Sequence, residues 1–129
     1  MPITRATDIA LRMLITLASE PDSHTTIANL AEAIDVPVRY TGKMVQRLAA
    51  DGWIDTNRGR GGGIKVSAAG QAATPVDVIN AFGEGWPIID CIKPKCPLLA
   101  RGCHLRDMLN DAEEAFKHTL STATMVQLA

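Results

Sequence analysis

The stretch from Pro37 to Ser67 reads PVRYTGKMVQRLAADGWIDTNRGRGGGIKVS, and its patterns largely decide the fold that the sequence predicts. Apolar residues at helical spacing predict a helix over 38–51, and Gly52 suits the left-handed position that commonly ends a helix. One face of this helix is expected to be buried and holds Thr41, Met44, Val45, Leu48 and Ala49. The opposite face is polar and basic and holds Arg39, Gly42, Lys43, Gln46 and Arg47.

A shorter helix over 26–34 precedes this one, and the turn DVPV joins them. Pro37 pushes the residue before it out of helical geometry, so the two helices are separate. Two short helices joined by a tight turn, the second with a basic face, are typical of a helix-turn-helix. The second helix has the width to enter the major groove of DNA, where Arg and Gln side chains can bond to base edges. We therefore expect DNA contacts from Arg39, Lys43, Gln46 and Arg47.

The glycine-rich run RGRGGG, from Arg58 to Gly63, lies between two strand-like segments, WIDTN and IKVS. Its glycines permit close approach to sugar and phosphate, while Arg58 and Arg60 supply charge or enter the minor groove. A nucleotide-binding phosphate loop is the rival interpretation, but that loop needs a strand that leads into a helix. Here the glycines link strand to strand, directly after a helix-turn-helix. The run is therefore predicted to be the wing of a winged helix, with Arg58 and Arg60 as DNA contacts.

The charge of the chain is unevenly distributed. The net charge is −1, yet residues 39–65 hold six basic side chains against two acidic ones, a local charge of +4. Basic residues gathered in one segment indicate binding to a polyanion such as DNA. A solvated surface is the alternative that charge alone leaves open.

Helices are also expected on both sides of this stretch. A helix over 4–19 would bury one stripe, and a short helix opens at Thr74-Pro75 and ends at Gly83. The first stripe holds Ala6, Ala10, Leu11, Leu14, Ile15 and Ala18. After Cys103 the chain returns to a long amphipathic helix, whose stripe holds Leu105, Met108, Leu109, Ala112, Phe116 and Leu120. Such a helix after a small DNA-binding unit favours dimerisation, although packing on its own core would give the same pattern.

The predicted fold class is mainly α with a small β wing. A winged helix-turn-helix over 1–83 would be followed by a loop over 84–104 and by a dimerisation helix and tail over 105–129. The length of 129 residues suits one domain, and the hydrophobic fraction of 47% is that of a folded chain. No apolar run could cross a bilayer and no signal peptide is apparent, so we expect a cytoplasmic protein without a membrane partner. The sequence shows no nucleophile–base pair and no phosphate loop in a setting typical of an enzyme. We therefore do not expect an enzyme.

The loop CIKPKCPLLARGCHL, from Cys91 to Leu105, holds all three cysteines, separated by four and then six residues. An odd count in a reducing compartment argues against disulfides. A structural zinc site generally has four ligands at closer spacing than these cysteines. His104 is next to Cys103 in the chain, so the two side chains could hardly bind the same metal. Three thiolates with one labile ligand suit an iron–sulfur cluster that is open to small molecules. A zinc-stabilised module and a metal-free thiol switch remain as alternatives.

The segments TDIALRMLITLA and RGRGGGI, with the three-cysteine loop and the long helix after it, resemble the IscR/NsrR group of winged-helix iron–sulfur regulators. The resemblance covers nearly the whole chain, and the loop, AEEAF and the closing TMVQL resemble the nitric-oxide-sensing branch. It implies a homodimeric repressor that binds a palindromic operator in double-stranded DNA and releases it when nitric oxide reacts with a bound cluster. The same scaffold could instead sense iron supply or cluster status.

The resemblance also implies a set of cluster ligands. In one branch a histidine three residues after the last cysteine completes a 2Fe–2S centre, but Arg106 stands there in this chain. A variant with Glu and His on the first helix does not match Asp8 and Arg12 either. In the nitric-oxide-sensing branch an aspartate on the first helix ligates a 4Fe–4S cluster of the opposite subunit, and Asp8 stands at that place.

The implied ligands are therefore Cys91, Cys96 and Cys103 of one chain and Asp8 of the partner subunit, with 4Fe–4S favoured over 2Fe–2S. The six-residue gap before Cys103 is one longer than is usual in the group. From the residues alone, Asp8 is also an exposed first-turn carboxylate that the helix dipole favours.

Overall fold

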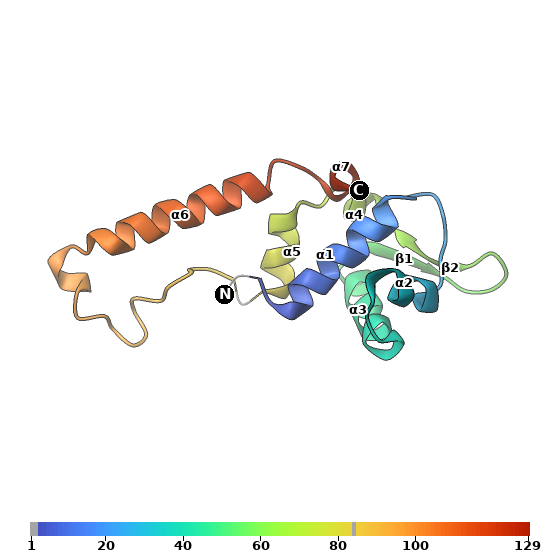
Figure 1. Ribbon diagram of the computed structural model, residues 1–129, viewed down its shortest axis with the longest axis horizontal. Coiled ribbons are helices and arrows are strands. Elements are labelled where there is room, and N and C mark those ends of the chain that lie inside the picture. The colour runs from blue at the N-terminus through green and yellow to red at the C-terminus, as the bar shows by residue number, and fades with distance from the viewer. Residues whose placement is uncertain (1–2, 84) are drawn as a thin grey trace.

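Helices and a β hairpin surround one core in the computed structural model, which describes residues 3–83 and 85–129 (Figure 1). The body begins with α1 (Arg5–Ala18), α2 (Ile27–Ile34), α3 (Val38–Ala50), β1 (Ile54–Asn57) and β2 (Gly63–Val66). The chain continues through α4 (Ala68–Ala72), α5 (Pro75–Phe82), a 3-10 turn η1 (Leu99–Arg101), α6 (His104–Leu120) and α7 (Met125–Leu128). The mainly helical fold with a small β wing is thus confirmed.

Helix α1 lies at the centre of the body. Its N-cap is Thr4, whose hydroxyl accepts a hydrogen bond from the Thr7 backbone N–H at 3.1 Å. Its buried apolar residues are Ile9, Ala10, Met13, Leu14, Leu17 and Ala18. The expected stripe was wrong in part, because Ala6, Leu11 and Ile15 are only partly buried. The reason is that α1 packs against α2, α5 and α7 at once, so its buried surface is wider than one stripe and is rotated from it.

The helices of the helix-turn-helix lie within one residue of their predicted bounds, and the buried face of α3 is the predicted one except that Ala49 is only partly buried. Helix α2 is capped by the Thr26 hydroxyl, and Asp35 takes the left-handed conformation at its end, with φ of 55°. On α3 the buried side chains are Thr41, Met44, Val45 and Leu48. The chain then turns at Gly52, whose φ of 82° is a conformation that glycine adopts without a steric penalty.

The wing is an antiparallel hairpin in which Ile54 pairs with Val66 and Asn57 pairs with Gly63. Its base is held by a third segment, because the backbones of Thr25 and Ile64 exchange hydrogen bonds of 2.9 and 2.8 Å. Gly63 has φ of 134°, and a Cβ there would lie 2.5 Å from the Thr25 carbonyl oxygen. Only glycine therefore lets the wing join the segment that leads into α2, and this fixes the wing beside the helix-turn-helix.

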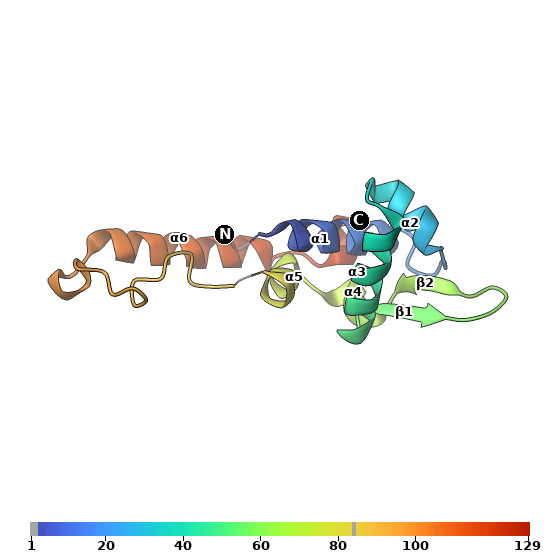
Figure 2. The ribbon, with the colours of Figure 1, turned by 90° about the horizontal axis from the view of Figure 1, so that it is seen from below.

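Helix α6 projects from the body as an arm, and the chain between α5 and α6 runs out along it (Figures 1 and 2). The chain then returns to the body, where the Met125 side chain is fully buried and its backbone N–H bonds to the Ala73 carbonyl at 2.8 Å. The division at 83 and 104 stays a prediction, and residue 84 lies outside the described residues. Among the residues described, no helix is both long and apolar enough to cross a bilayer.

Candidate nucleic-acid interface and cysteine loop

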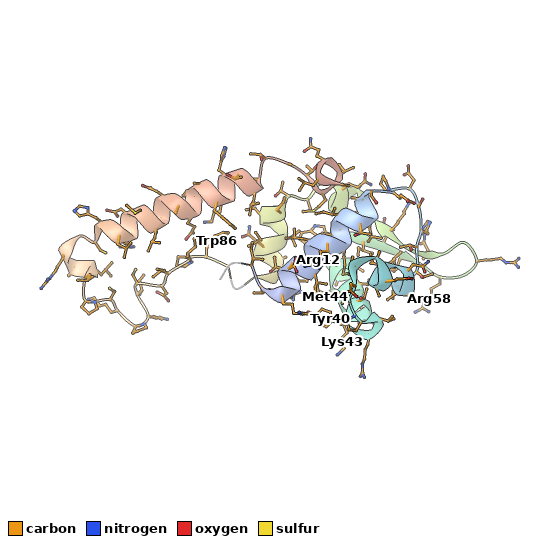
Figure 3. All side chains as sticks on the ribbon, viewed as in Figure 1. Arg12, Tyr40, Lys43, Met44, Arg58 and Trp86 are labelled. Atoms are coloured by element: carbon orange, nitrogen blue, oxygen red, sulfur yellow. The ribbon has the colours of Figure 1, made fainter. Side chains whose placement is uncertain are left out.

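An open groove of about 860 Å³ lies between α3 and the wing. Of the side chains predicted to contact DNA, it is lined by Arg39, Lys43, Gln46 and Arg58. Lys43 points away from the body in Figure 3, and Arg58 lies on the wing. The remaining lining is polar or apolar rather than acidic, and it includes Thr25, Thr26, Thr56 and Asn57. The groove is thus a cationic surface built from a helix and a hairpin.

A side-chain contact joins the wing to the segment that precedes α2. The side chain of Asn57, at the end of β1, contacts the His24 imidazole, with 3.0 Å between Nδ2 and Nε2. The tip of the wing turns at Gly59 and Gly61, with φ of 93° and 74°, and it exposes Arg60 to solvent. Arg60 does not line the groove and lies at the hairpin tip beyond it. The structure therefore presents both wing arginines, one at the groove and one at the tip.

Gly42 lies on the groove side of α3, and packing within the chain does not require it. A Cβ at this position would meet only Ile27 Cγ2, at 3.9 Å, which is an ordinary van der Waals distance. Glycine costs about 0.5–1 kcal/mol inside a helix relative to alanine. Close approach of a bound duplex would account for this glycine better than packing within the chain does.

Arg47 is separated from the other predicted DNA contacts. Its Nη2 donates a hydrogen bond of 2.6 Å to the Ala81 carbonyl, and its Cζ lies 4.0 Å from the centre of the Phe82 ring. Both partners belong to the last turn of α5, on the other side of α3 from the wing. The structure thus gathers Arg39, Lys43 and Gln46 in the groove and directs Arg47 away from it.

The three cysteines are free thiols, and each is half-buried. A turn brings the Cys96 backbone N–H to the Cys91 carbonyl at 2.9 Å, and Cys103 immediately precedes the first residue of α6. Asp90 accepts hydrogen bonds from the backbone N–H groups of Ile92 and Lys93, and these hold the pKa of its carboxyl below the ordinary value. Within residues 3–83 and 85–129, no three His, Cys, Asp or Glu side chains are grouped closely enough to hold a metal ion.

The loop nevertheless fits an iron–sulfur cluster in its donor chemistry. Three unpaired, half-buried thiols on one segment are the ligands that such clusters take. The Asp8 carboxylate pairs with Arg12 in this chain, at 2.8 and 3.0 Å. The first turn of α1 belongs to the body, whereas the loop lies along the arm (Figures 1 and 2).

An anchor between the loop and α6 involves Glu113, which is not part of the apolar stripe predicted for this helix. Glu113 is nevertheless buried and only 8% exposed. Its carboxylate accepts a hydrogen bond of 3.0 Å from the Ile88 backbone N–H and pairs with Lys117 Nζ at 2.8 Å. The Lys117 hydrogen bond and then the Ile88 hydrogen bond lower the pKa of Glu113, and Glu113 raises the pKa of Lys117. The i, i+4 spacing of the pair was the available signal.

The same anchor includes an aromatic pair. Trp86 meets Phe116 edge to face, with ring centres 5.7 Å apart, and Lys117 Nζ lies 4.6 Å from the centre of the Trp86 ring. The Trp86 indole N–H also donates to Asn80 Oδ1 of α5 at 2.9 Å. Figure 3 shows Trp86 between α5 and α6. The start of the loop is therefore fixed to two helices before the chain reaches Cys91.

The apolar stripe expected on α6 is divided between two faces. Leu109, Phe116 and Leu120 are half-buried along the side of the helix that carries Glu113. Leu105 and Met108 are instead 60% and 69% exposed. With Ala112, Ala115 and Thr119, which are also exposed, they form a stripe at alternating spacings of three and four residues. We call these five residues the outer stripe.

Comparisons with known proteins agree with this structure. A model of the Rrf2 family, described as an iron-dependent transcriptional regulator, matches residues 3–129. The NsrR transcriptional repressor of Streptomyces coelicolor is 35% identical over 132 residues, which cover 99% of this chain and 88% of that protein. The NsrR transcriptional regulator of Bacillus subtilis is 31% identical, with 99% and 90% covered.

Two solved structures share the fold. IscR of T. potens has a TM-score of 0.76 and 14% identity over 98% of this chain and 84% of that one. CymR of Staphylococcus aureus has a TM-score of 0.75 and 21% identity, with 98% and 96% covered. The relatives are transcriptional regulators rather than enzymes, as the sequence predicted. With a family model that matches nearly its whole length, the chain belongs to the Rrf2 family of transcriptional regulators.

Proposed function

We propose that the chain is a homodimeric DNA-binding repressor whose operator binding is switched by nitric oxide through a bound iron–sulfur cluster. The observation that carries this proposal is the pairing of a cationic groove with a separate loop of three free thiols in a chain of this family. One surface is suited to a duplex and the other to a soft metal centre. The relatives named NsrR are transcriptional regulators, and one of them is named as a repressor.

The groove supplies the DNA-reading surface. Helix α3 would enter the major groove, where Arg39 and Gln46 can bond to base edges and Lys43 can pair with phosphate. The wing would follow the backbone, with Arg58 and Arg60 at phosphates or in the flanking minor groove. No acidic residue lines the described groove, so the approach of a phosphate meets no local repulsion.

The outer stripe of α6 favours a homodimer. Leu105 and Met108 expose large apolar surfaces on an arm that the body does not cover. Alternating spacings of three and four are those at which one helix packs on another along a seam. A second copy of α6 would bury the stripe, and the resulting two-fold symmetry would suit a palindromic operator.

Cys91, Cys96 and Cys103 would hold the cluster, and Asp8 of the partner subunit would complete it. When bound, a cluster would supply iron that nitric oxide can bind. Asp8 would have to exchange its ion pair with Arg12 for this role, and the distance between the first turn of α1 and the loop favours donation between subunits. With Arg106 at the position of the alternative histidine ligand, we favour a 4Fe–4S cluster over a 2Fe–2S cluster.

The test begins with protein purified without oxygen. Its visible spectrum and its iron and sulfide content are measured, and nitric oxide is then titrated while binding to a duplex selected from a random-sequence pool is followed. We expect a brown protein that releases the duplex as nitric oxide is added. A colourless, metal-free protein with the same affinity would contradict the proposal.

Sensing of iron or of cluster supply is a second candidate function, favoured by the family description as iron-dependent. Under this alternative the protein would release DNA when iron is chelated but would keep it when nitric oxide is added. The two titrations on one preparation therefore separate the candidates.

A further inference from the structure

The orientation of Arg47 sets it apart from the other basic residues of α3. Its guanidinium donates to the Ala81 carbonyl at 2.6 Å and stacks on the Phe82 ring at 4.0 Å, so its planar face and one donor are both occupied within the chain. Arg39 and Lys43, on the same helix, line the groove instead. A guanidinium held in this way is directed toward the end of α5 rather than into the groove, although the side chain itself stays exposed.

Phe82 is the residue at which three segments meet. It is the last residue of α5, and only 6% of it is exposed. Its carbonyl accepts a hydrogen bond of 3.4 Å from the hydroxyl of Thr4, the N-cap of the helix that carries Asp8. Its ring is covered by Arg47 of the recognition helix. Phe82 thus contacts both α1 and α3 at the point where the chain leaves the body toward the cysteine loop.

The chain beyond Phe82 is held again by the anchor on α6. Trp86 contacts Asn80 and Phe116, and the Ile88 backbone bonds to Glu113. Contacts therefore run from α3 through Phe82 and the end of α5 to the residues just before Cys91. If the loop moved relative to the body, these contacts could pass the movement on to the recognition helix α3.

We propose that Arg47 is a positioning residue that couples the recognition helix to the cysteine loop and is not a DNA contact. The coupling part rests on the proposed function, whereas the absence of a DNA contact does not. A guanidinium can stack flat on a ring while it donates to a carbonyl in a fixed direction, and a lysine ammonium lacks that planar fork. The clasp between Arg47 and Phe82 would therefore set how α3 lies relative to α5.

The salt dependence of DNA binding distinguishes the two roles of Arg47. Each phosphate contact that is lost makes the slope of log affinity against log salt concentration shallower by about 0.9. If Arg47 contacts a phosphate, the slope should become shallower in Arg47→Ala and stay unchanged in Phe82→Leu. If Arg47 instead holds α3 on α5 through Phe82, the slope should stay unchanged in Arg47→Ala. The two variants should then have similar effects on DNA affinity, since either one opens the same contact.

The experiment compares the single variants Arg47→Ala, Arg47→Lys and Phe82→Leu with the double variant R47A/F82L, and Lys43→Ala serves as the matched DNA-contact control. Affinity for the selected duplex is measured across a salt series with cluster-free and cluster-loaded protein, and hydrogen exchange is measured at the last turn of α5. Arg47→Lys keeps the charge and most of the bulk, so it serves if Arg47→Ala does not fold.

We expect a shallower slope only in Lys43→Ala. Arg47→Ala, Arg47→Lys and Phe82→Leu should each reduce the ratio of loaded to cluster-free affinity several-fold, with faster exchange at the end of α5. The double variant should be no worse than either single variant. A slope in Arg47→Ala that matches Lys43→Ala, or full retention of the ratio and of exchange protection in both Arg47 variants, would overturn the proposal. If the wild-type ratio were itself close to one, the proposed function would fail, while slope and exchange would still decide the role of Arg47.

Discussion

Gly42 shows at the scale of one residue how the demands of folding and of binding differ. It is a glycine inside a helix, on the groove side, where a methyl group would meet only Ile27 Cγ2 at 3.9 Å. Gly63 is the opposite case, because its φ of 134° and the Thr25 carbonyl leave no room for a side chain. In the sequence, both are glycines in a basic segment and look alike. Only their surroundings in the structure show that folding requires Gly63 and does not require Gly42.

Gly42→Ala should therefore raise stability and weaken DNA binding. Alanine is favoured over glycine in a helix interior by about 1 kcal/mol, and the added methyl group fits within the chain. The same methyl group would hold the duplex away from α3. Urea unfolding measures the first effect and duplex affinity the second. Gly63→Ala is the control and should lose stability. A Gly42→Ala protein that binds the duplex as well as the wild type would contradict the idea that Gly42 allows the duplex to approach α3 closely.

The carboxylate of Glu113 predicts how the stability of the anchor on α6 depends on pH. Its pKa is below the ordinary value of 4.5 because Lys117 and the Ile88 backbone favour the ionised form. A carboxyl whose pKa is lowered on folding stabilises the folded state above its unfolded pKa, and this stabilisation is lost as the pH falls through the lower, folded value. The pKa of Lys117 is above its ordinary 10.5, so its contribution is present below that value and is lost as the pH rises through the folded pKa.

The fluorescence of Trp86 in cluster-free protein should thus stay constant between pH 4.5 and 10.5 and change outside that range as the anchor opens. Glu113→Gln, which cannot ionise, should remove the acid transition. Trp86→Phe identifies the part of the signal that Trp53 contributes. An acid transition that survived in Glu113→Gln would assign it to another group.

At the scale of elements, sequence patterns predicted best where local signals are strong. The bounds of α2 and α3, the wing and the turn at Gly52 follow from caps, proline and glycine, which act within a few residues. The buried faces of α1 and α6 were predicted less well, because they depend on how many partners each helix meets. Helix α1 has partners on several sides, whereas α6 turns one side to the loop and leaves the outer stripe exposed.

The outer stripe makes a prediction about assembly. Met108→Glu should convert the proposed dimer to a monomer, because it would place a charge within the apolar seam that the dimer would bury. Glu114→Gln also changes the charge of the helix, but at a side chain that is 75% exposed and lies off the stripe, so it should leave the dimer intact. Sedimentation equilibrium measures the mass of each. A Met108→Glu protein that remained dimeric would show that α6 does not form the interface.

At the scale of the whole molecule, the chain separates a DNA-reading body from a thiol-bearing arm. The residue types at both ends could be predicted from the sequence, since a basic helix, a glycine-rich wing and clustered cysteines are local patterns. The connection between them could not, because Arg47 looks like one more basic residue of α3 until its contacts with Ala81 and Phe82 are seen. The gathering of the three thiols at one metal stays a proposal, and no such group forms within the described residues of one chain.

The central claim is that DNA affinity depends on what the thiols of Cys91, Cys96 and Cys103 hold. The most direct test measures the affinity of one anaerobic preparation for one selected duplex, before and after its cluster is removed, at fixed salt concentration. A coupling of about 3 kcal/mol would lower the affinity by roughly two orders of magnitude. Equal affinities before and after removal would contradict the claim, whatever metal the loop had carried.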